Sequence, residues 1–389
     1  MELTEDQKRL VQSLGSWYKS SDRQFYSYTG AAGTGKTTVI KAFIDALGIQ
    51  RYISCAYVGK AVTVLSRHGL PASTIHSLIY NVDWVPVKDA NGKTIFHDNG
   101  QPKMKVEFSL KPELQGDPEL VIVDEATMVN DDLCDDILSF GRKTVFIGDN
   151  NQLPPVFGVS SVMLNPNFAL TKIMRQAEND PIVYLSQRVL HNEPLIPGTY
   201  GSSHVYRSLN LGRNWTDYDA IITPLNRIRD HINDHIRYNV LGIRSSIPVI
   251  GDKIICRQND WKRCIEGNIF LTNGMIGEVT DIYRAETKGK SISIDFKPEI
   301  SNEEFYNLPI DISYITKGYD ERKAYGISSA EKFEYAYAVT CHSYQGSEAD
   351  RVLYIDRFVH DADMTKRLRY TGITRARYKI DITSDIILE

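Results

Sequence analysis

The sequence lacks the features of an exported or membrane-bound protein. Its 389 residues include five cysteines, which are scattered and form no C-x-x-C pair. Cysteines in this arrangement are typical of reduced thiols in the cytosol. No apolar run approaches the length needed to cross a membrane, and the N-terminal residues do not resemble a signal peptide. We therefore expect a cytoplasmic protein without a membrane partner.

The sequence also lacks an excess of positive charge. Its 45 Lys and Arg residues are balanced by 49 Asp and Glu residues, which gives a net charge of −4. This balance disfavours a basic coat over the whole surface, but it allows a narrow cleft lined locally with basic residues. An apolar content of 42% and a charged content of 24% are ordinary for a globular protein, and the length favours two or three domains. Composition leaves the function open.

One glycine-rich stretch carries the clearest chemical signal. Residues 30–37 fit the pattern G-x-x-x-x-G-K-[ST], between an apolar run at 25–28 and an amphipathic segment at 39–47. A strand, such a loop and a helix in this order bind nucleoside triphosphates, because backbone N–H groups at the helix N-terminus attract phosphate. An unliganded turn is the weaker alternative. The candidate phosphate-binding residues are Gly30, Gly33, Gly35, Lys36, Thr37 and Thr38, with the Thr37 hydroxyl as a Mg²⁺ ligand.

Polar residues follow two other apolar runs. Residues 120–123 precede Asp124 and Glu125, and residues 143–147 precede a turn that contains Gln152. Asp124 can hold the water shell of Mg²⁺, and Glu125 can accept a proton from an attacking water. Gln152 can orient that water or sense the γ-phosphate. Ligands of open α/β sheets bind at the carboxyl ends of the strands, so we expect these side chains near the glycine-rich loop.

Several single residues have two interpretations. Thr4 and Gln7 fit a capping box, and local sequence does not choose between that role and a ligand contact for Gln7. For His76 alone, a buried helix histidine is favoured. His231 and His235 have metal-ligand spacing, but no cysteine or acidic partner completes a site, so an exposed helix face is the default.

The α/β pattern is interrupted twice. Residues 81–118 contain two Asn-Gly turns between alternating runs, which predicts a projecting β-hairpin or, alternatively, a plain surface hairpin. Residues 245–330 consist of short runs separated by Gly, Asn and Asp, which predicts a small β-barrel. The remaining segments form a first α/β domain over 1–80 and 119–170 and a second over 171–244 and 331–389. We expect strands at 94–97 in the hairpin, at 120–124 and at 220–223, and helices at 181–190 and 227–241.

In this order, the motifs resemble those of the superfamily 1 helicases, and in particular the RecD- and Dda-like branch. The matching stretches are residues 30–38, 58–61, 73–76, 124–125, 148–152, 175–176, 251–253, 273–274, 340–348 and 370–377. The resemblance implies an α/β fold of two RecA-like P-loop NTPase domains with ATP between them. It further implies a strand-separating β-hairpin insertion in the first domain and an SH3-like β-barrel insertion in the second.

The resemblance also assigns roles to individual residues. The residues expected in ATP hydrolysis are Lys36, Glu125 as general base, Gln152 as coupler to the DNA strand, and Arg175 and Arg375 as arginine fingers. The residues expected to bind ATP or Mg²⁺ are Gln7 at adenine, the glycine-rich loop from Gly30 to Thr38, and Asp124 at the metal. The residues expected along the DNA strand are Lys60, Thr63, Thr74, His76, Asn226, Thr340 and His342. For Arg375, the residues alone leave a surface salt bridge open.

The function implied is an ATP-dependent DNA helicase that moves 5′→3′ on single-stranded DNA and opens duplex or forked DNA. The expected cofactors are ATP and Mg²⁺, and the expected protein is a monomer with replication proteins as partners. An RNA-directed helicase and a non-unwinding ATP switch are the alternatives. Two positions depart from the family pattern: Tyr57-Val58 replaces a usual Pro-Thr, and Thr371-Gly372 replaces apolar residues. The short motor is typical of a phage or mobile element, which would place the protein in a host cytoplasm.

Overall fold

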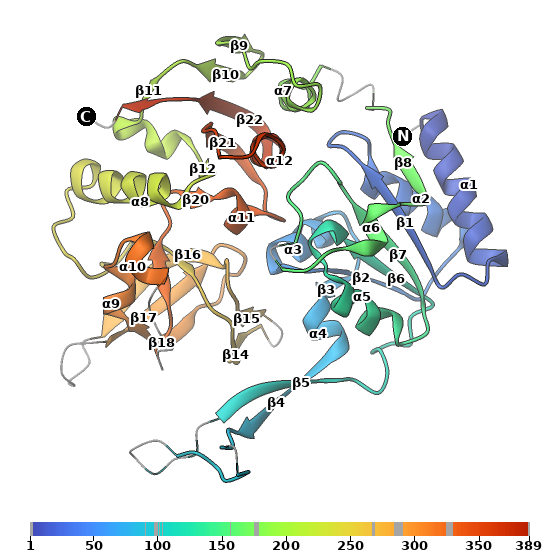
Figure 1. The fold of residues 1–389 in the computed structure, drawn as a ribbon, viewed down its shortest axis with the longest axis horizontal. Helices are drawn as coiled ribbons and strands as arrows, with labels where there is room; N and C mark the ends of the chain where they lie inside the picture. The colour runs from blue at the N-terminus through green and yellow to red at the C-terminus, as the bar shows by residue number, and fades with distance from the viewer. Residues whose placement is uncertain are drawn as a thin grey trace.

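The computed structural model describes residues 3–89, 91–96, 100, 102, 104–155, 157–174, 179–266, 269–283, 291–323 and 330–387. Two α/β units face each other in it, and each carries a β-rich extension (Figure 1). We call them the first unit and the second unit in chain order.

The first unit is built on a parallel sheet whose described strands have the order β3-β2-β6-β7-β1-β8. These strands are β1 (Phe25–Gly30), β2 (Tyr52–Ala56), β3 (Ala72–Thr74), β6 (Leu120–Asp124), β7 (Lys143–Gly148) and β8 (Phe168–Leu170). In β6, residues 120–123 are all fully buried, as expected for a parallel strand covered on both faces. Leu120 and Ile122 enter one core, while Val121 and Val123 enter the other.

Helices cover both faces of this sheet. They are α1 (Glu5–Ser20), α2 (Lys36–Leu47), α3 (Gly59–Arg67), α4 (Ile75–Ile79), the 3₁₀ turn η1 (Ala126–Met128), α5 (Asp131–Leu138) and α6 (Ser161–Leu164). Side chains of α1 and α2 pack in one core, and those of α4 and α5 pack in the other. At the start of α1, Thr4 and Gln7 form the predicted capping box, with both reciprocal hydrogen bonds present.

A two-stranded ribbon projects from the first unit beyond α4 (Figure 1). Strand β4 (Tyr80–Pro86) pairs antiparallel with β5 (Met104–Leu110), in register from Tyr80–Leu110 to Pro86–Met104. The strand expected at 94–97 is not found in its described part, where Thr94 makes an isolated bridge to Lys88. The Asn91-Gly92 turn closes onto Asp89, and Ile95 donates its N–H to the Val87 carbonyl at 2.8 Å, so residues 93–95 run back antiparallel to 87–89.

The second unit repeats the architecture of the first. Its described strands have the order β20-β12-β21-β22-β10-β9, and all neighbours are parallel except β9 and β10. They are β9 (Gly198–Tyr200), β10 (Ser203–Tyr206), β12 (Ala220–Thr223), β20 (Val339–Thr340), β21 (Ala349–Ile355) and β22 (Ala376–Thr383). A short parallel pair, β11 (Leu209–Asn210) and β23 (Ile386–Ile387), lies beside the sheet. The mixed α/β class predicted from the sequence is therefore present.

The helical elements of the second unit include one irregular segment. They are α7 (Pro181–Leu190), the 3₁₀ turn η2 (Gly212–Asp217), α8 (Asn226–Asp234), the π-helical η3 (His235–Val240), α11 (Cys341–Tyr344) and α12 (Ala362–Ile373). The helix predicted over 227–241 is thus α8 continued by a π-helical stretch. Asp361 caps α12 through its side chain, which receives the N–H of Met364.

The β-rich insertion of the second unit contains an antiparallel sheet in the order β18-β17-β16-β13-β19 and a separate β14–β15 pair. Its elements are β13 (Lys253–Cys256), β14 (Asp260–Ile265), β15 (Ile269–Leu271), β16 (Ile276–Tyr283), β17 (Ser291–Pro298), β18 (Phe305–Asp311), α9 (Ile312–Ile315), α10 (Tyr319–Lys323) and β19 (Phe333–Tyr335). Strand β19 pairs with β13, and Phe333 is buried against Phe296. The insertion therefore reaches Tyr335, beyond the boundary expected at 330.

Candidate active site between the two units

The glycine-rich loop has the backbone that its pattern predicts. Gly33 and Gly35 have φ values of 80° and 78°, in a region that residues with a side chain rarely adopt. Gly35 is also short of space, since an added Cβ would lie 2.5 Å from both Gln7 Nε2 and Met174 Sδ. The loop thus enters α2 through a tight turn, and the N-terminus of such a helix attracts anions.

Gln7 and Lys36 both fold against this loop. Gln7 accepts the Thr4 N–H at 2.9 Å through Oε1 and donates to the Thr34 carbonyl at 2.9 Å through Nε2. One buried amide therefore caps α1, which confirms the capping interpretation, and also fastens that helix to the loop. Lys36 Nζ donates to the Gly30 carbonyl at 2.8 Å, so its charge lies at the start of the loop.

Asp124 and Glu125 lie at the carboxyl end of β6. Burial, aided by the neighbouring Glu125 charge, raises the pKa of Asp124 to about 6. Glu125 has a left-handed backbone with φ of 50°, an unusual conformation for a residue of this size. Its Oε2 is buried and accepts no hydrogen bond from any described residue. A buried carboxylate oxygen without a donor is costly, and such groups cluster at functional sites.

These residues fit the predicted Mg²⁺ ion. Thr37 is the second residue of α2, which follows β1, and Asp124 ends β6 of the same sheet, so each offers an oxygen at the same edge. Mg²⁺ prefers oxygen ligands and usually keeps several waters beside one or two protein groups. The buried negative charge at Asp124, whose pKa is raised, is the type of site that a cation stabilises.

Arg375 brings the second unit to this site. It follows α12 and is buried, with its Nη1 3.8 Å from Glu125 Oε1 and its Nε donating to the Thr371 carbonyl at 3.1 Å. The surface salt bridge that the sequence left open is therefore wrong, because the ion pair is buried between the units. Gln152 lies in the turn after β7, and its buried Oε1 has no partner among the described residues. Arg175, the other expected finger, lies outside the described residues.

Helix α12 makes further contacts with the first unit that sequence reasoning missed. The Tyr370 hydroxyl accepts the Ala32 N–H of the glycine-rich loop at 2.7 Å and donates to Asp149 Oδ2 at 2.6 Å. The Thr371 hydroxyl accepts the Leu153 N–H at 3.2 Å. The departure of Thr371 from the family pattern was the available signal, since a hydroxyl in a buried helix needs a partner.

The turn at 149–153 is also held by longer side chains of the second unit. Arg367 Nη1 donates to the carbonyls of Asn150 at 2.7 Å and Gln152 at 2.9 Å. Gln345 Nε2 donates to the Leu153 carbonyl at 2.9 Å. We call residues 149–153 the Asp149 turn; almost every residue in it touches the second unit.

The residues predicted to line the DNA strand occupy equivalent places in the two sheets. Strands β3 and β20 are matching edge strands, and each ends in a threonine that caps the next helix: Thr74 accepts the Ser77 N–H, and Thr340 accepts the Ser343 N–H. His76 and His342 are then the second residues of those helices.

Strands β2 and β12, which lie next to β3 and β20, also occupy equivalent places in the two sheets. Lys60 follows β2 near the start of α3, and Asn226 follows β12 as the first residue of α8. Lys60 Nζ lies 3.0 Å from Glu299 Oε2 of the insertion and over the Tyr344 ring. Thr63 lies further along α3, where its hydroxyl bonds back to the Gly59 carbonyl.

An aromatic cluster, formed by Tyr57, His76, Tyr80, Phe108 and Trp261, joins the ribbon to the insertion. The ring of Trp261 in β14 lies 5.4 Å from Phe108 of β5 and 5.8 Å from His76. Tyr57 and Tyr80 also contact the His76 ring. Burial lowers the pKa of His76, which favours a neutral imidazole. Tyr57 and Phe108 still expose about two fifths of their surface, at 42% and 41%.

Two family models match the chain. A model described as an AAA domain matches residues 2–195, and one described as a UvrD-like helicase C-terminal domain matches residues 335–380. The ATP-dependent RecD2 DNA helicase of Deinococcus radiodurans is 26% identical over 90% of this chain. The ATP-dependent DNA helicase dda of Enterobacteria phage T4 is 23% identical over 97% of this chain. This chain belongs to the superfamily 1 helicases of the RecD, Dda and Pif1 type.

Solved structures share the fold of this helicase. Bacteroides Pif1 bound to single-stranded DNA has a TM-score of 0.51 at 17% identity, covering 98% of this chain and 92% of the Pif1 chain. A structure of two coordinating Pif1 helicases at forked duplex DNA has a TM-score of 0.52, with the same identity and coverage. The helicase spans 45% of the length of the Deinococcus relative and 98% of the phage relative.

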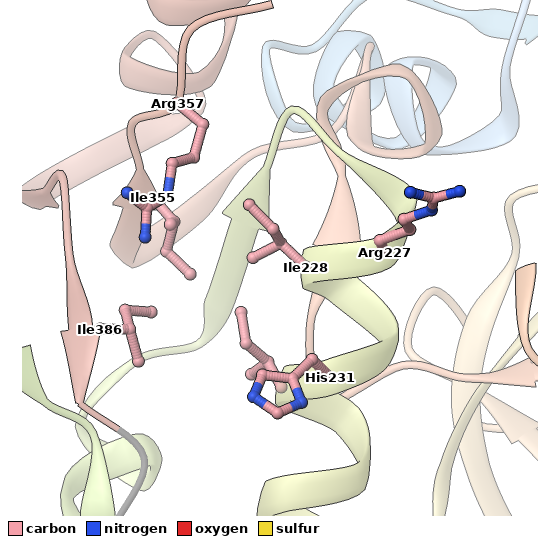
Figure 2. Close-up of a pocket in the computed structure, with 7 residues that line it drawn as sticks. Arg227, Ile228, His231, Ile355, Arg357 and Ile386 are labelled. Atoms are coloured by element: carbon pink, nitrogen blue, oxygen red, sulfur yellow. The ribbon is translucent and has the colours of Figure 1, made fainter.

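One surface cavity of the helicase lies apart from the glycine-rich loop. It has a volume of about 440 Å³ and lies between α8, the end of β21 and β23 (Figure 2). Arg227, His231 and Arg357 line it over a floor of isoleucines. Each arginine already pairs with a carboxylate, Arg227 with Asp320 and Arg357 with Asp385.

Two other features of the helicase bear on earlier expectations. The exposed helix face expected for His231 and His235 is wrong for His235, which is buried, because the chain turns there from α8 into the π-helical η3. Among the described residues, no group of three or more His, Cys, Asp or Glu side chains is placed to hold a metal. No described helix is long and apolar enough to cross a membrane. The five cysteines are unpaired; Cys264 is exposed, and the other four are buried.

Proposed function

We propose that this helicase hydrolyses ATP to move along single-stranded DNA in the 5′→3′ direction and thereby unwinds duplex DNA. The observation that carries the proposal is the contact of Glu125 with Arg375, which places a base of the first unit and a cation of the second at one buried point. A nucleotide bound between Glu125 and Arg375 would contact both units at the same time. The curated relatives in Deinococcus and phage T4 are named ATP-dependent DNA helicases, which supports ATP and DNA as the substrates.

ATP hydrolysis is assigned to residues of both units. Lys36 and the N–H groups of residues 33–37 bind the phosphates, and Gln7, which is fastened to the loop through Thr34, contacts the base. A Mg²⁺ ion held by Thr37 and Asp124 would neutralise phosphate charge. Glu125 takes a proton from the attacking water, which Gln152 orients. Both side chains have a buried oxygen without a partner among the described residues, so each is available for a water.

Domain closure is assigned to the arginine fingers. In the structure, Arg375 Nη1 lies 3.8 Å from Glu125 Oε1 and balances its charge. The more negative γ-phosphate would attract the guanidinium away from Glu125 and leave that carboxylate free to act as a base. Arg175 is proposed as the second finger from its place in the motif order. Phosphate release would return Arg375 to Glu125 and allow the units to separate.

The DNA strand is proposed to cross the carboxyl ends of both sheets. The matched threonine caps, Thr74 and Thr340, expose helix N-termini at corresponding points, and such N-termini bind phosphate. Lys60 and Asn226 add one polar group to each unit, and His76 and His342 follow the caps. Contacts to phosphate and rings make binding tolerant of sequence and sensitive to salt.

The β4–β5 ribbon is proposed as the wedge that separates the strands. It projects beyond α4 (Figure 1). Among the described residues, its only aromatic support from the second unit is the ring of Trp261 against Phe108. A wedge must resist the duplex, and packed rings stiffen an otherwise two-stranded ribbon, which is marginal alone. We further propose a monomer that acts in the cytoplasm, or in a host cytoplasm for a phage-encoded chain, beside replication proteins.

The test is ATP hydrolysis with and without single-stranded DNA, run beside unwinding of duplexes with a 5′ or a 3′ overhang. We expect strong stimulation by DNA and opening of the 5′-tailed duplex alone. Opening of the 3′-tailed duplex instead would reverse the direction. Stimulation by matched RNA but not by DNA would favour an RNA-directed helicase, and binding without turnover would favour an ATP switch.

A further inference from the structure

We propose that Tyr370 is a positioning residue for ATP hydrolysis, through a hydroxyl that links the glycine-rich loop, the Asp149 turn and Arg375. The inference deepens the proposed function and rests on it. Tyr370 belongs to the second unit, whereas both hydrogen-bond partners of its hydroxyl belong to the first. It is fully buried, so these bonds form without competition from water.

The hydroxyl uses both its donor and its acceptor capacity. It accepts the N–H of Ala32, three positions before Gly35, and it donates to Oδ2 of Asp149. The other oxygen of Asp149 receives the N–H and the amide group of Asn151. Asp149 is itself fully buried, and a buried carboxylate requires such donors. Burial and the Asp149 charge hold the pKa of Tyr370 well above its usual value, so the phenol stays protonated and can donate.

The same segment of chain continues to Arg375. Thr371 receives the Leu153 N–H with its hydroxyl, and its carbonyl receives the Nε of Arg375. Residues 370, 371 and 375 therefore contact the loop, the Asp149 turn and Glu125 in succession. A displacement of the loop by phosphate is transmitted through the Tyr370 hydroxyl to the finger. The hydroxyl at position 371, which departs from the family pattern, supplies the second bond of this link.

The decisive experiment is Tyr370→Phe, which removes one oxygen and keeps the ring. We expect DNA-stimulated kcat for ATP to fall about tenfold, the effect of losing a hydrogen bond to a charged group, while KM for ATP changes less than about twofold. Binding of ATP relies on the loop itself, and only the arrangement of Glu125 and Arg375 depends on the hydroxyl. Melting temperature is measured alongside to follow folding.

Tyr354→Phe is the matched control. Tyr354 is also fully buried in the second unit and packs against Gly372 of α12, and its hydroxyl lies beside Cys341 of the same unit. Its substitution is expected to leave kcat and KM unchanged. If both variants lower kcat equally, the effect is one of packing and the proposal fails.

A double-mutant cycle with Asp149→Asn gives a second test. If the hydroxyl acts through Asp149, Tyr370→Phe should lower kcat much less in the Asp149→Asn variant than in the wild type. Full additivity, an unchanged kcat for Tyr370→Phe, or a rise in KM alone would each overturn the proposal. The ATPase rate without DNA is also measured in every variant. If DNA does not stimulate the wild type, the proposed function is contradicted, but the effect of Tyr370→Phe on the DNA-free rate still tests the role of Tyr370.

Discussion

The glycine-rich loop and the aromatic cluster are built in opposite ways. The loop is one continuous stretch, residues 30–37, whose shape follows from left-handed glycines and a helix start. The cluster gathers Tyr57, His76, Tyr80, Phe108 and Trp261 from segments up to two hundred residues apart. Chemistry performed by backbone groups is therefore readable from local spacing, whereas a surface of side chains from several segments is not.

We expect a division between the two regions: the glycine-rich loop supports ATP turnover, and the aromatic cluster supports unwinding. Changes in the loop should remove ATP turnover and with it every later step, while changes in the cluster should spare ATP turnover and weaken unwinding. A variant of one region with the phenotype of the other would break this division.

The largest effect is expected for Lys36→Ala. This side chain carries the charge nearest to the loop, and its loss should lower ATP turnover by about a thousandfold, because no other described cation occupies the start of the loop. Steady-state ATPase assays with saturating single-stranded DNA measure it. Lys41→Ala, on the same helix and outside the motif, is the control and should retain turnover.

A somewhat smaller effect is expected for Glu125→Gln. The amide keeps the shape of the carboxylate but cannot accept a proton, so turnover should fall about a hundredfold while ATP still binds. Fluorescent ATP-analogue binding and ATPase rates separate the two steps. Glu113→Gln, at an exposed position of the same unit, is the control. Normal turnover in Glu125→Gln would remove Glu125 from its role.

The cluster is tested by Trp261→Ala. Loss of the ring contacts with Phe108 and His76 should lower the unwinding rate about fivefold, in line with the energy of such aromatic pairs, and leave DNA-stimulated ATPase near the wild-type value. Unwinding of a 5′-tailed duplex reports the effect. Tyr306→Ala removes an exposed ring, with 66% of its surface accessible, from the same insertion and should change neither rate. Equal losses of ATPase and unwinding would contradict the division.

The smallest effect concerns stability of the insertion that carries Trp261. Burial, reinforced by Asp260, raises the pKa of Glu331 to about 7. Between about pH 4.5 and 7, the Glu331 carboxyl is protonated in the folded state but ionised in the unfolded state. The unfolded state therefore binds fewer protons, and the free energy of unfolding falls as the pH rises through this range. Glu331→Gln should remove that loss, on the order of 1–3 kcal/mol, and raise the melting temperature at pH 8 more than at pH 5.

Thermal unfolding at the two pH values measures the difference. Glu278→Gln, at an exposed position of β16, serves as the control and should shift both melting temperatures equally. If Glu331→Gln shifts the melting temperature equally at pH 5 and pH 8, the carboxyl of Glu331 has the same pKa in the folded and unfolded states, and the prediction fails.

Much of the fold followed from sequence pattern. The strands at 120–124 and 220–223 and the helix at 181–190 were expected almost to the residue, because buried parallel strands are continuous apolar runs and a proline marks the helix start. The strand expected at 94–97 is reduced in its described part to an antiparallel bridge between Thr94 and Lys88, because the Asn91-Gly92 turn leaves room for only a short pairing. The insertion extended beyond 330, because the pairing of Phe333–Tyr335 with β13 depends on a strand eighty residues earlier.

By itself, the sequence determined the groups proposed to bind phosphate and metal: Gly33 and Gly35 in the loop, Lys36 and Thr37 at the start of a helix, and Asp124 at the end of a strand. Only the tertiary structure decided which residues of the other unit lie against the site. It placed Arg375 on Glu125, Tyr370 between Ala32 and Asp149, and Trp261 against Phe108. The reason is physical: local spacing constrains backbone geometry within a few residues, whereas a contact between units depends on how two complete sheets pack together.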